Sequence, residues 1–326
     1  PTYFFSIPAN MENLNNHVQV TTFYKFIPLT QAEVSHHRDS LLKAAEGTDL
    51  KGLFIMGKEG VNSTYAGPRE QAENLKQVIE TVFGTSDITY KDSFCDRQPF
   101  NDFKVKVRDE IVTIGRPDLI PHETRHNHLC PDEWDRVLKE EDVVCIDTRN
   151  DYEFEVGHFK GALNPDIKQF TDFPDYIRNA NIPKDKKVLI YCTGGIRCEK
   201  AILDMEDAGY TNVFQLEGGI LNYLKSHPHQ EWEGECFVFD YRVAVDQELN
   251  PSHMFKLCPH CGQPAKETIQ CLHCHTEAVV CAHCLEKDAE LYKTCSKNCA
   301  HHYHMGHRYK KPHFDAKIKR GELQNK

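Results

Sequence analysis

The stretch KVLIYCTGGIRCEKAILDMEDAG, residues 187 to 209, joins a short apolar run to a glycine pair and an amphipathic segment. The run 187–191 predicts a buried strand that ends just before Cys192. Four apolar residues of the following segment share one helical face: Ile196, Ala201, Ile202 and Met205. The stretch therefore predicts a strand, a tight loop and a helix.

The same alternation of strand and helix extends over residues 130–228. The apolar runs are short, β-branched and not interrupted by polar residues, which is typical of parallel strands buried on both faces. We therefore predict a doubly wound parallel sheet. Ligands of such sheets bind beyond the carboxyl ends of the strands, where Cys192 is placed.

Cys192 is the candidate nucleophile. A helix N-terminus and the N–H groups of the loop favour its thiolate. Arg197 offers fixed donors to an anion at the sulfur, such as thiosulfate, a persulfide, a phosphate or an oxyanion. The alternative is a buried cysteine followed by an ordinary Gly-Gly turn. The candidate active-site loop comprises Cys192, Thr193, Gly194, Gly195, Ile196 and Arg197.

Residues 18–115 predict a different kind of domain. Thr30, followed three residues later by Glu33, predicts the N-cap of a first helix. A second helix is expected between Pro68 and Gly84. With strands between and after these helices, the order β-α-β-β-α-β predicts a ferredoxin-like α+β sandwich that ends with the strands of 103–115. Residues 116–129 hold two prolines and three histidines and predict a linker.

The C-terminal region, 229–326, begins with one expected strand at 236–245 and then carries four close cysteine pairs. These candidate metal ligands are Cys258, Cys261, Cys271, Cys274, Cys281, Cys284, Cys295 and Cys299. Eight thiolates suit two tetrahedral structural zinc sites, and an iron–sulfur cluster is the alternative. The spacing allows two pairings. Joining 258/261 to 271/274 gives sequential ribbons, whereas joining 258/261 to 281/284 gives an interleaved cross-brace.

Charge and composition limit the classes of function. The net charge of -10 argues against a protein that coats nucleic acid over its whole surface, although residues 301–326 carry seven Lys/Arg against two Asp/Glu. This basic tail predicts either a phosphate contact or a disordered terminus. The sequence has no long apolar run and no signal peptide, so we expect a cytoplasmic protein without a membrane span. No glycine fingerprint supports a flavin or nicotinamide, and His313-x-Asp315 is an incomplete iron motif.

Three stretches resemble a rhodanese domain: IDTRNDYEFEVGHFKGALNP (146–165), YCTGGIRCEKA (191–201) and LEGGI (216–220). The resemblance implies that Cys192 can carry sulfur as a persulfide. Related phosphatases have a loop one residue longer, so the C-x4-R spacing implies sulfur-sized chemistry.

The arrangement is similar, over nearly the full chain, to the bacterial tRNA uridine(34) hydroxylases. The similarity rests on the loop with its second cysteine, on EGVNSTYAG (59–67), on KVKVRDEIV (104–112) and on the cysteine-rich region. It implies oxygen-dependent hydroxylation at C5 of the wobble uridine, with the tRNA anticodon loop as partner and molecular oxygen as co-substrate.

A metal-free hypothesis follows for Cys192. Its thiolate adds to C6 of uracil, and the enolate-like C5 then reacts with oxygen or a bound peroxy species. Cys198 either resolves an oxidised Cys192 as a disulfide or is a small core residue. Asp147, Arg149 and Glu153 are expected to organise the domain.

Two other functions are compatible with the loop. One is a sulfurtransferase that moves persulfide sulfur from thiosulfate or from a sulfur-carrier protein. The other is a non-enzymatic RNA-binding adaptor in which the loop only senses an anion.

Overall fold

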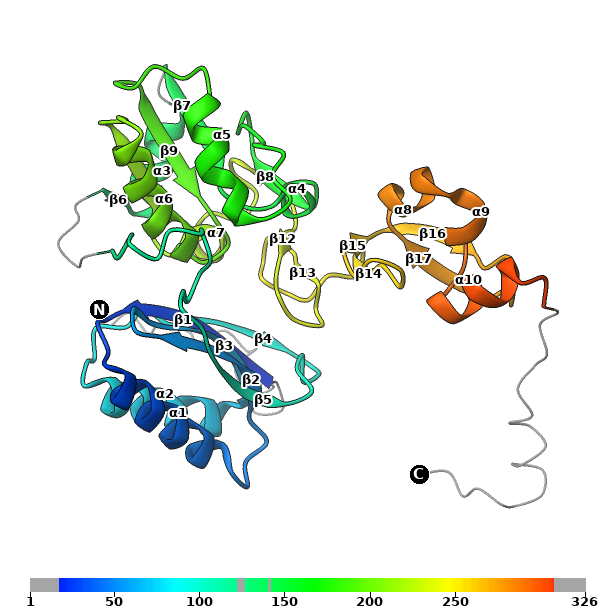
Figure 1. Cartoon of the computed structure of the whole chain (residues 1–326), viewed down its shortest axis with the longest axis horizontal. Coiled ribbons are helices and arrows are strands. Elements are labelled where there is room, and N and C mark those ends of the chain that lie inside the picture. Colours follow the sequence, from blue (N-terminus) through cyan, green and yellow to red (C-terminus); the bar gives the residue numbers. More distant parts are fainter. Residues whose placement is uncertain (1–17, 122–126, 140–141, 308–326) are drawn as a thin grey trace, which may run out of the picture. The chain divides into compact units, whose positions relative to one another are not determined.

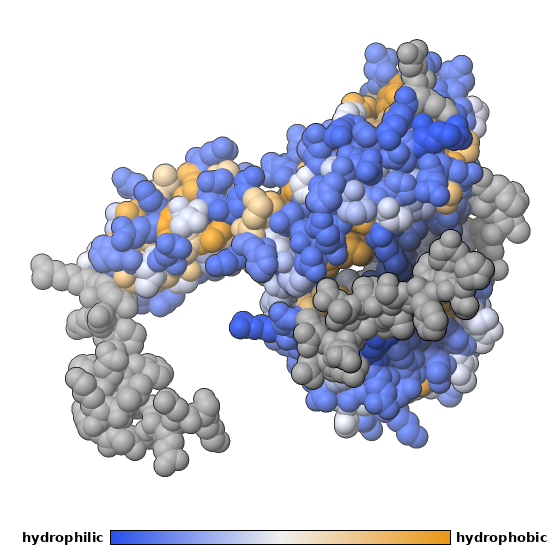
Figure 2. All heavy atoms as spheres, turned by 180° about the vertical axis from the view of Figure 1, so that it is seen from behind, coloured by the Kyte–Doolittle hydropathy of each residue, from blue (hydrophilic) through white to orange (hydrophobic). Residues whose placement is uncertain are grey.

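A computed structural model describes residues 18–121, 127–139 and 142–307 of the chain (Figure 1). The chain divides after His253 into two compact units. Among the described residues, no helix is both long and apolar enough to cross a membrane. The face shown in Figure 2 is mostly hydrophilic, with hydrophobic residues in small separate groups.

The N-terminal domain is a sheet with two helices on one of its faces (Figure 1). Its strands are β1 (Val18–Phe26), β2 (Lys51–Gly57), β3 (Gly60–Pro68), β4 (Lys91–Cys95) and β5 (Phe103–Val107), and its helices are α1 (Gln31–Ala45) and α2 (Arg69–Phe83). The strand order β4-β1-β3-β2-β5 confirms the predicted ferredoxin-like sandwich. One assignment differs: β4 completes the β-α-β-β-α-β motif, and β5 is an additional edge strand parallel to β2.

Local sequence accounts for the helix ends. Thr30 and Glu33 form the predicted capping box at the start of α1. Pro68 is the N-cap residue of α2, one position before its predicted place, and Gly84 ends this helix in the left-handed conformation. Both helices cover the sheet face that carries Phe23 and other buried aromatic residues. Because side chains alternate along a strand, the even-numbered residues of β1 and β3 lie on the opposite face.

The central domain contains a parallel sheet in the order β6-β10-β9-β7. Its strands are β6 (His128–Leu129), β7 (Val143–Asp147), β9 (Lys187–Tyr191) and β10 (Val213–Leu216), and its helices are α3 (Pro131–Leu138), α4 (Asp151–Phe154), α5 (Phe173–Asn179), α6 (Ile196–Asp207) and α7 (Gly219–Ser226). Val188 and Ile190 pack with α5 and α6 in one core, whereas Leu189 and Tyr191 pack with α3 and α7 in another. Helices on both faces confirm the doubly wound fold.

Two segments extend the central domain beyond its sheet. Residues 128 and 129, placed in the linker from sequence, pair with β10 as β6 because their backbone continues the parallel ladder. Ile114, placed in the N-terminal domain from sequence, is buried in the core shared by α5 and α6. The segment around Ile114 therefore packs in the core of the central domain.

The strand expected at 236–245 is instead a pair of short strands. β12 (Cys236–Phe237) and β13 (Ala244–Val245) pair antiparallel around a turn, while β11 (Trp232–Gly234) pairs with β8 (Gly157–Phe159). Val243 adopts a φ of 66° within this turn, which a continuous strand excludes.

The second unit consists of short elements around the cysteine pairs. They are β14 (Lys256–Leu257), β15 (Pro264–Ala265), β16 (Glu267–Gln270), β17 (Glu277–Val280), α8 (Ala282–Lys287), α9 (Ala289–Tyr292) and α10 (Lys297–His304). Its buried cluster is small and includes Cys258, Cys281 and Cys284 themselves. Such a unit has little apolar core, so metal binding would supply much of its folding free energy.

Candidate active site and metal centres

Cys192 follows β9 directly and is 1% exposed. Gly195, the N-cap residue of α6, has a φ of 100°, and its N–H donates to Cys192 Sγ at 3.1 Å. A Cβ at position 195 would lie 3.0 Å from the hydroxyl of Tyr24 in β1, so the loop fits tightly against the N-terminal domain. The sulfur is thus held by loop backbone at the carboxyl edge of the sheet.

The surroundings of Cys192 favour its thiolate. Burial raises the pKa of this thiol, but a hydrogen bond from Cys198, the charge of Arg197 and nearby backbone N–H groups lower the pKa more, to about 6. Burial and the hydrogen bond to Cys192 raise the pKa of Cys198 well above its ordinary value. Near neutral pH the pair therefore consists of a Cys192 thiolate and a Cys198 thiol.

Arg197 is anchored by Glu153. The two terminal nitrogens of Arg197 donate to the Glu153 carboxylate at 2.7 and 2.8 Å, and both residues are buried. A guanidinium has five N–H donors, so this bidentate pair engages two of them. The positive charge stays beside the sulfur in a fixed orientation.

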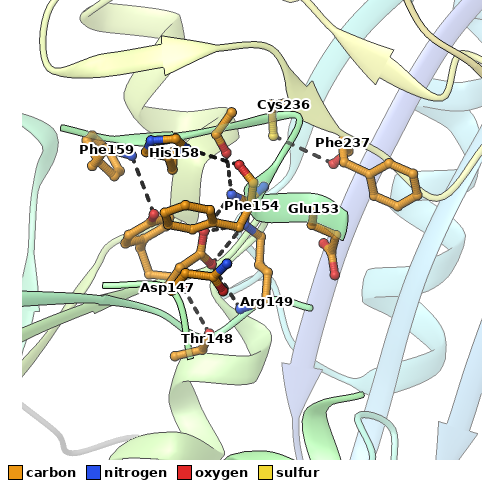
Figure 3. Close-up of polar contacts among 12 residues, drawn as sticks. Asp147, Thr148, Arg149, Glu153, Phe154, His158, Phe159, Cys236 and Phe237 are labelled. Atoms are coloured by element: carbon orange, nitrogen blue, oxygen red, sulfur yellow. Dashed lines mark hydrogen bonds and ion pairs between the residues drawn. The ribbon is translucent and has the colours of Figure 1, made fainter. Parts of the chain in front are cut away.

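Asp147 and Arg149 form a second buried pair, shown in Figure 3. Arg149 Nη2 donates to Asp147 Oδ2 at 2.6 Å and to the carbonyl of Gly157 at 2.6 Å, which ties the end of β7 to β8. Neither charged side chain reaches solvent. This geometry supports an organising role for the pair.

A cavity of about 420 Å³ opens in front of the loop. One wall is the open face of the N-terminal sheet, and the others come from the loop and from the turn between β12 and β13. Thr22, Tyr24, Ile55, Asn62 and Thr64 line it on the sheet side, and Cys192, Thr193 and Phe239 line it on the other sides. The cavity therefore joins the candidate nucleophile to a surface that the α/β domain alone does not possess.

Several side chains at this junction were missed from sequence. Tyr24 donates to Glu199 of α6 at 2.8 Å, and His128 contacts the same carboxylate at 3.0 Å. Lys91 Nζ lies 5.0 Å from the centre of the Tyr24 ring. No local motif marks these residues, because they meet only when the two domains dock.

A buried ion cluster fixes that docking. Lys200 Nζ lies 2.8 Å from both Glu59 and Glu110, and all three side chains are buried. Glu59 also accepts from the N–H of Ile111. Lys200 lies on α6, so the cluster ties the active-site helix to the N-terminal domain.

The eight cysteines form two quartets. Cys258, Cys261, Cys281 and Cys284 make one, and Cys271, Cys274, Cys295 and Cys299 make the other, with all thiol sulfurs of a quartet within 4.8 Å of one another. Four sulfurs at about 2.3 Å from a central ion lie about 3.8 Å apart, so both quartets fit a tetrahedral metal. The pairing is the interleaved cross-brace. His313, Asp315 and most of the basic tail lie outside the described residues.

Three family models match separate parts of the chain. Residues 18–111 match the model of the UPF0176 acylphosphatase-like domain, 131–226 match the rhodanese-like domain, and 233–300 match the rhodanase C-terminal domain. A tRNA uridine(34) hydroxylase of Bdellovibrio bacteriovorus is 53% identical over 89% of this chain and 82% of its own length. One from Legionella pneumophila is 45% identical over 71% of this chain and 91% of its own length. A rhodanese-like domain from Anabaena is 19% identical, covers 34% of this chain and 80% of its own length, and has a TM-score of 0.29.

Proposed function

The chain belongs to the tRNA uridine(34) hydroxylase family, and we propose that it hydroxylates the uridine at position 34 of tRNA. The observation that carries this proposal is the identity of 53% over most of both chains. The modified atom is C5, the partner is the tRNA anticodon loop, and the reaction takes place in the cytoplasm. Because position 34 is unpaired, its base can leave the stack at small cost and enter the cavity.

Cys192 is the nucleophile of this reaction. Its lowered pKa and its place on the cavity wall support this role. The thiolate adds to C6 of uracil, which makes C5 electron-rich, and molecular oxygen adds there as a hydroperoxide. Arg197 and the loop N–H groups stabilise the negative charge that develops on the base.

Cys198 supplies the remaining electrons together with Cys192. The thiol of Cys198 reduces the hydroperoxide to an alcohol at C5 and becomes a sulfenic acid. Loss of the C5 proton then expels the Cys192 thiolate from C6, and this thiolate attacks the sulfenic acid to give a disulfide and water. One uridine, one oxygen molecule and two thiols then yield 5-hydroxyuridine, water and one disulfide. Cys198 contributes to the lowered pKa of Cys192, which supports this assignment, and an external thiol must reduce the disulfide for the next turnover.

The two cysteine quartets each hold a structural zinc ion in this proposal. Four cysteine ligands close the coordination sphere, which suits a structural role. The basic tail at 301–326 is expected to add phosphate contacts to tRNA.

The test is incubation of the protein with unmodified tRNA, a thiol reductant and ¹⁸O₂, followed by nucleoside mass spectrometry. We expect uridine to gain one labelled oxygen, and Cys192→Ser to abolish the gain while leaving tRNA binding intact. Full hydroxylation by Cys192→Ser removes the cysteine from the mechanism. Production of thiocyanate from thiosulfate and cyanide, without hydroxylation, favours the sulfurtransferase instead, and binding without either reaction favours the adaptor.

A further inference from the structure

The open face of the N-terminal sheet presents polar side chains to the cavity in a fixed register. Tyr24 on β1 is opposite Asn62 on β3, which is opposite Ile55 on β2. All three line the cavity that contains Cys192. Asn62 therefore lies in the middle of the wall, with neighbours on both sides that hold its strand in place.

The orientation of the Asn62 amide is determined by its hydrogen bond. Nδ2 lies 3.1 Å from the carbonyl oxygen of Ile111, which can only accept, so the amide nitrogen must face Ile111. Asn62 Oδ1 has no hydrogen-bond partner in the part of the chain that the structure describes, and one amide hydrogen also remains. The Asn62 side chain can therefore accept a hydrogen bond at Oδ1 and donate one from Nδ2 to a ligand in the cavity.

The other polar side chains on this face of β1 and β3 already have partners. The hydroxyls of Thr22 and Thr64 lie 3.0 Å from each other, and Tyr24 donates to Glu199. Thr193 Oγ1, next to Cys192, is buried and has no partner among the described residues. A hydroxyl both donates and accepts, so it does not discriminate between bases. On the sheet side of the cavity, Asn62 is therefore the residue that offers an acceptor with no partner among the described residues.

We infer that Asn62 is the residue that selects uracil, by accepting a hydrogen bond from its N3–H. This inference rests on the proposed function and deepens it. Uracil carries a donor at N3 between two carbonyl oxygens, so Oδ1 accepts from N3–H and the remaining amide hydrogen reaches a carbonyl. Cytosine has a lone pair at N3, which would face the lone pairs of Oδ1.

Phe239 provides an apolar surface in the same cavity. Its side chain is 63% exposed although it is aromatic, and the guanidinium of Arg197 lies 5.8 Å from the ring centre. Base–aromatic stacking is tolerant of sequence because every base has a π-face. Selection between pyrimidines must therefore come from hydrogen bonding at the edge of the base, which is what Asn62 offers.

The test compares binding of two anticodon stem-loops that differ only in U34 or C34, without oxygen so that no turnover occurs. We expect the wild-type protein to bind the U34 stem-loop on the order of 10- to 100-fold more tightly than the C34 stem-loop. With C34 bound, Asn62 Oδ1 is shielded from water by the base but receives no hydrogen bond from it. Asn62→Leu, which has a similar shape, should bring the ratio close to one. A salt concentration of about 200 mM reduces the contribution of phosphate contacts, which do not depend on the base.

Controls separate this inference from misfolding and from the proposed function. Asn74→Ala alters an exposed amide on α2, which covers the opposite face of the sheet, and should leave the preference unchanged. The rate of Cys192 alkylation shows whether Asn62→Leu keeps an intact site. The inference is overturned if the Asn62→Leu protein, with normal Cys192 alkylation, still prefers U34. It is also overturned if the wild-type protein hydroxylates U34 but binds both stem-loops equally. Failure of the wild type to hydroxylate uridine in air with reductant refutes the proposed function instead.

Discussion

Replacing Cys198 by alanine should raise the pKa of Cys192. The thiol of Cys198 donates to the Cys192 sulfur and is among the causes that bring that pKa from an ordinary 9.0 to about 6. A hydrogen bond to a charged group contributes about 1.5 to 3 kcal/mol, and a thiol is a weak donor, so we take the lower figure. Since 1.36 kcal/mol corresponds to one pKa unit, the pKa of Cys192 should move from about 6 to about 7.

The assay is the rate of Cys192 alkylation by iodoacetamide as a function of pH, read from the Cys192 peptide by mass spectrometry. A thiolate forms above its pKa, so a higher pKa lowers the thiolate fraction at pH 6. A more basic thiolate is also more nucleophilic, with a Brønsted slope of about 0.4 to 0.5. The variant should therefore react about twofold more slowly than wild type at pH 6 and about threefold faster at pH 9.

Cys198→Ser is the matched control, because a hydroxyl of similar size still donates a hydrogen bond. Its pH profile should stay close to that of the wild type. The reasoning is refuted if Cys198→Ala keeps the wild-type midpoint, or if serine shifts the midpoint as far as alanine does. The first result would mean that Arg197 and the loop backbone alone hold the thiolate, and the second that Cys198 does not act through a donated hydrogen bond.

Three further predictions concern stability and metal content. Lys200→Met should destabilise the protein by about 3 to 5 kcal/mol at pH 8 in urea unfolding, because two buried carboxylates lose their cation. The loss should be smaller at pH 5, because burial raises the pKa of Glu59 and this carboxyl then takes up a proton more readily. Cys258→Ser and Cys271→Ser should each retain about one equivalent of zinc out of two by mass spectrometry, with loss of both ions or of neither contradicting separate quartets. Gly157→Ala should lower the melting temperature, because its Cβ would lie 2.3 Å from the carbonyl oxygen of Glu235, and an unchanged value would contradict that contact.

Features that depend on neighbouring residues were predictable from the sequence. The strand, the glycine loop and α6 are contiguous, so the position of Cys192 at the carboxyl edge followed from local pattern. The capping box of Thr30 and Glu33 is equally local. These signals are short-range steric and hydrogen-bond preferences, which a single sequence displays directly.

Features that depend on distant pairing were not predictable. β4 begins with three polar residues and its first four positions are only half-buried, so the sequence pattern assigned its place in the motif to β5, which alternates apolar and polar residues. The two pairings of the cysteines satisfy the same spacing rule, and only the three-dimensional structure selects the cross-brace. Asn62 carries no motif, and it lines the same cavity as Cys192 only because the two domains dock.

The burial of Lys200 between Glu59 and Glu110 limits how this family can diverge. Loss of the lysine leaves two buried carboxylates without a cation, whereas loss of both carboxylates leaves a buried ammonium. Single substitutions at these positions are therefore costly, and a combined change to apolar residues is the tolerated route. We expect related sequences to keep all three charges or to have replaced them together. The two domains should accordingly be inherited as one unit, without exchange of either domain between lineages.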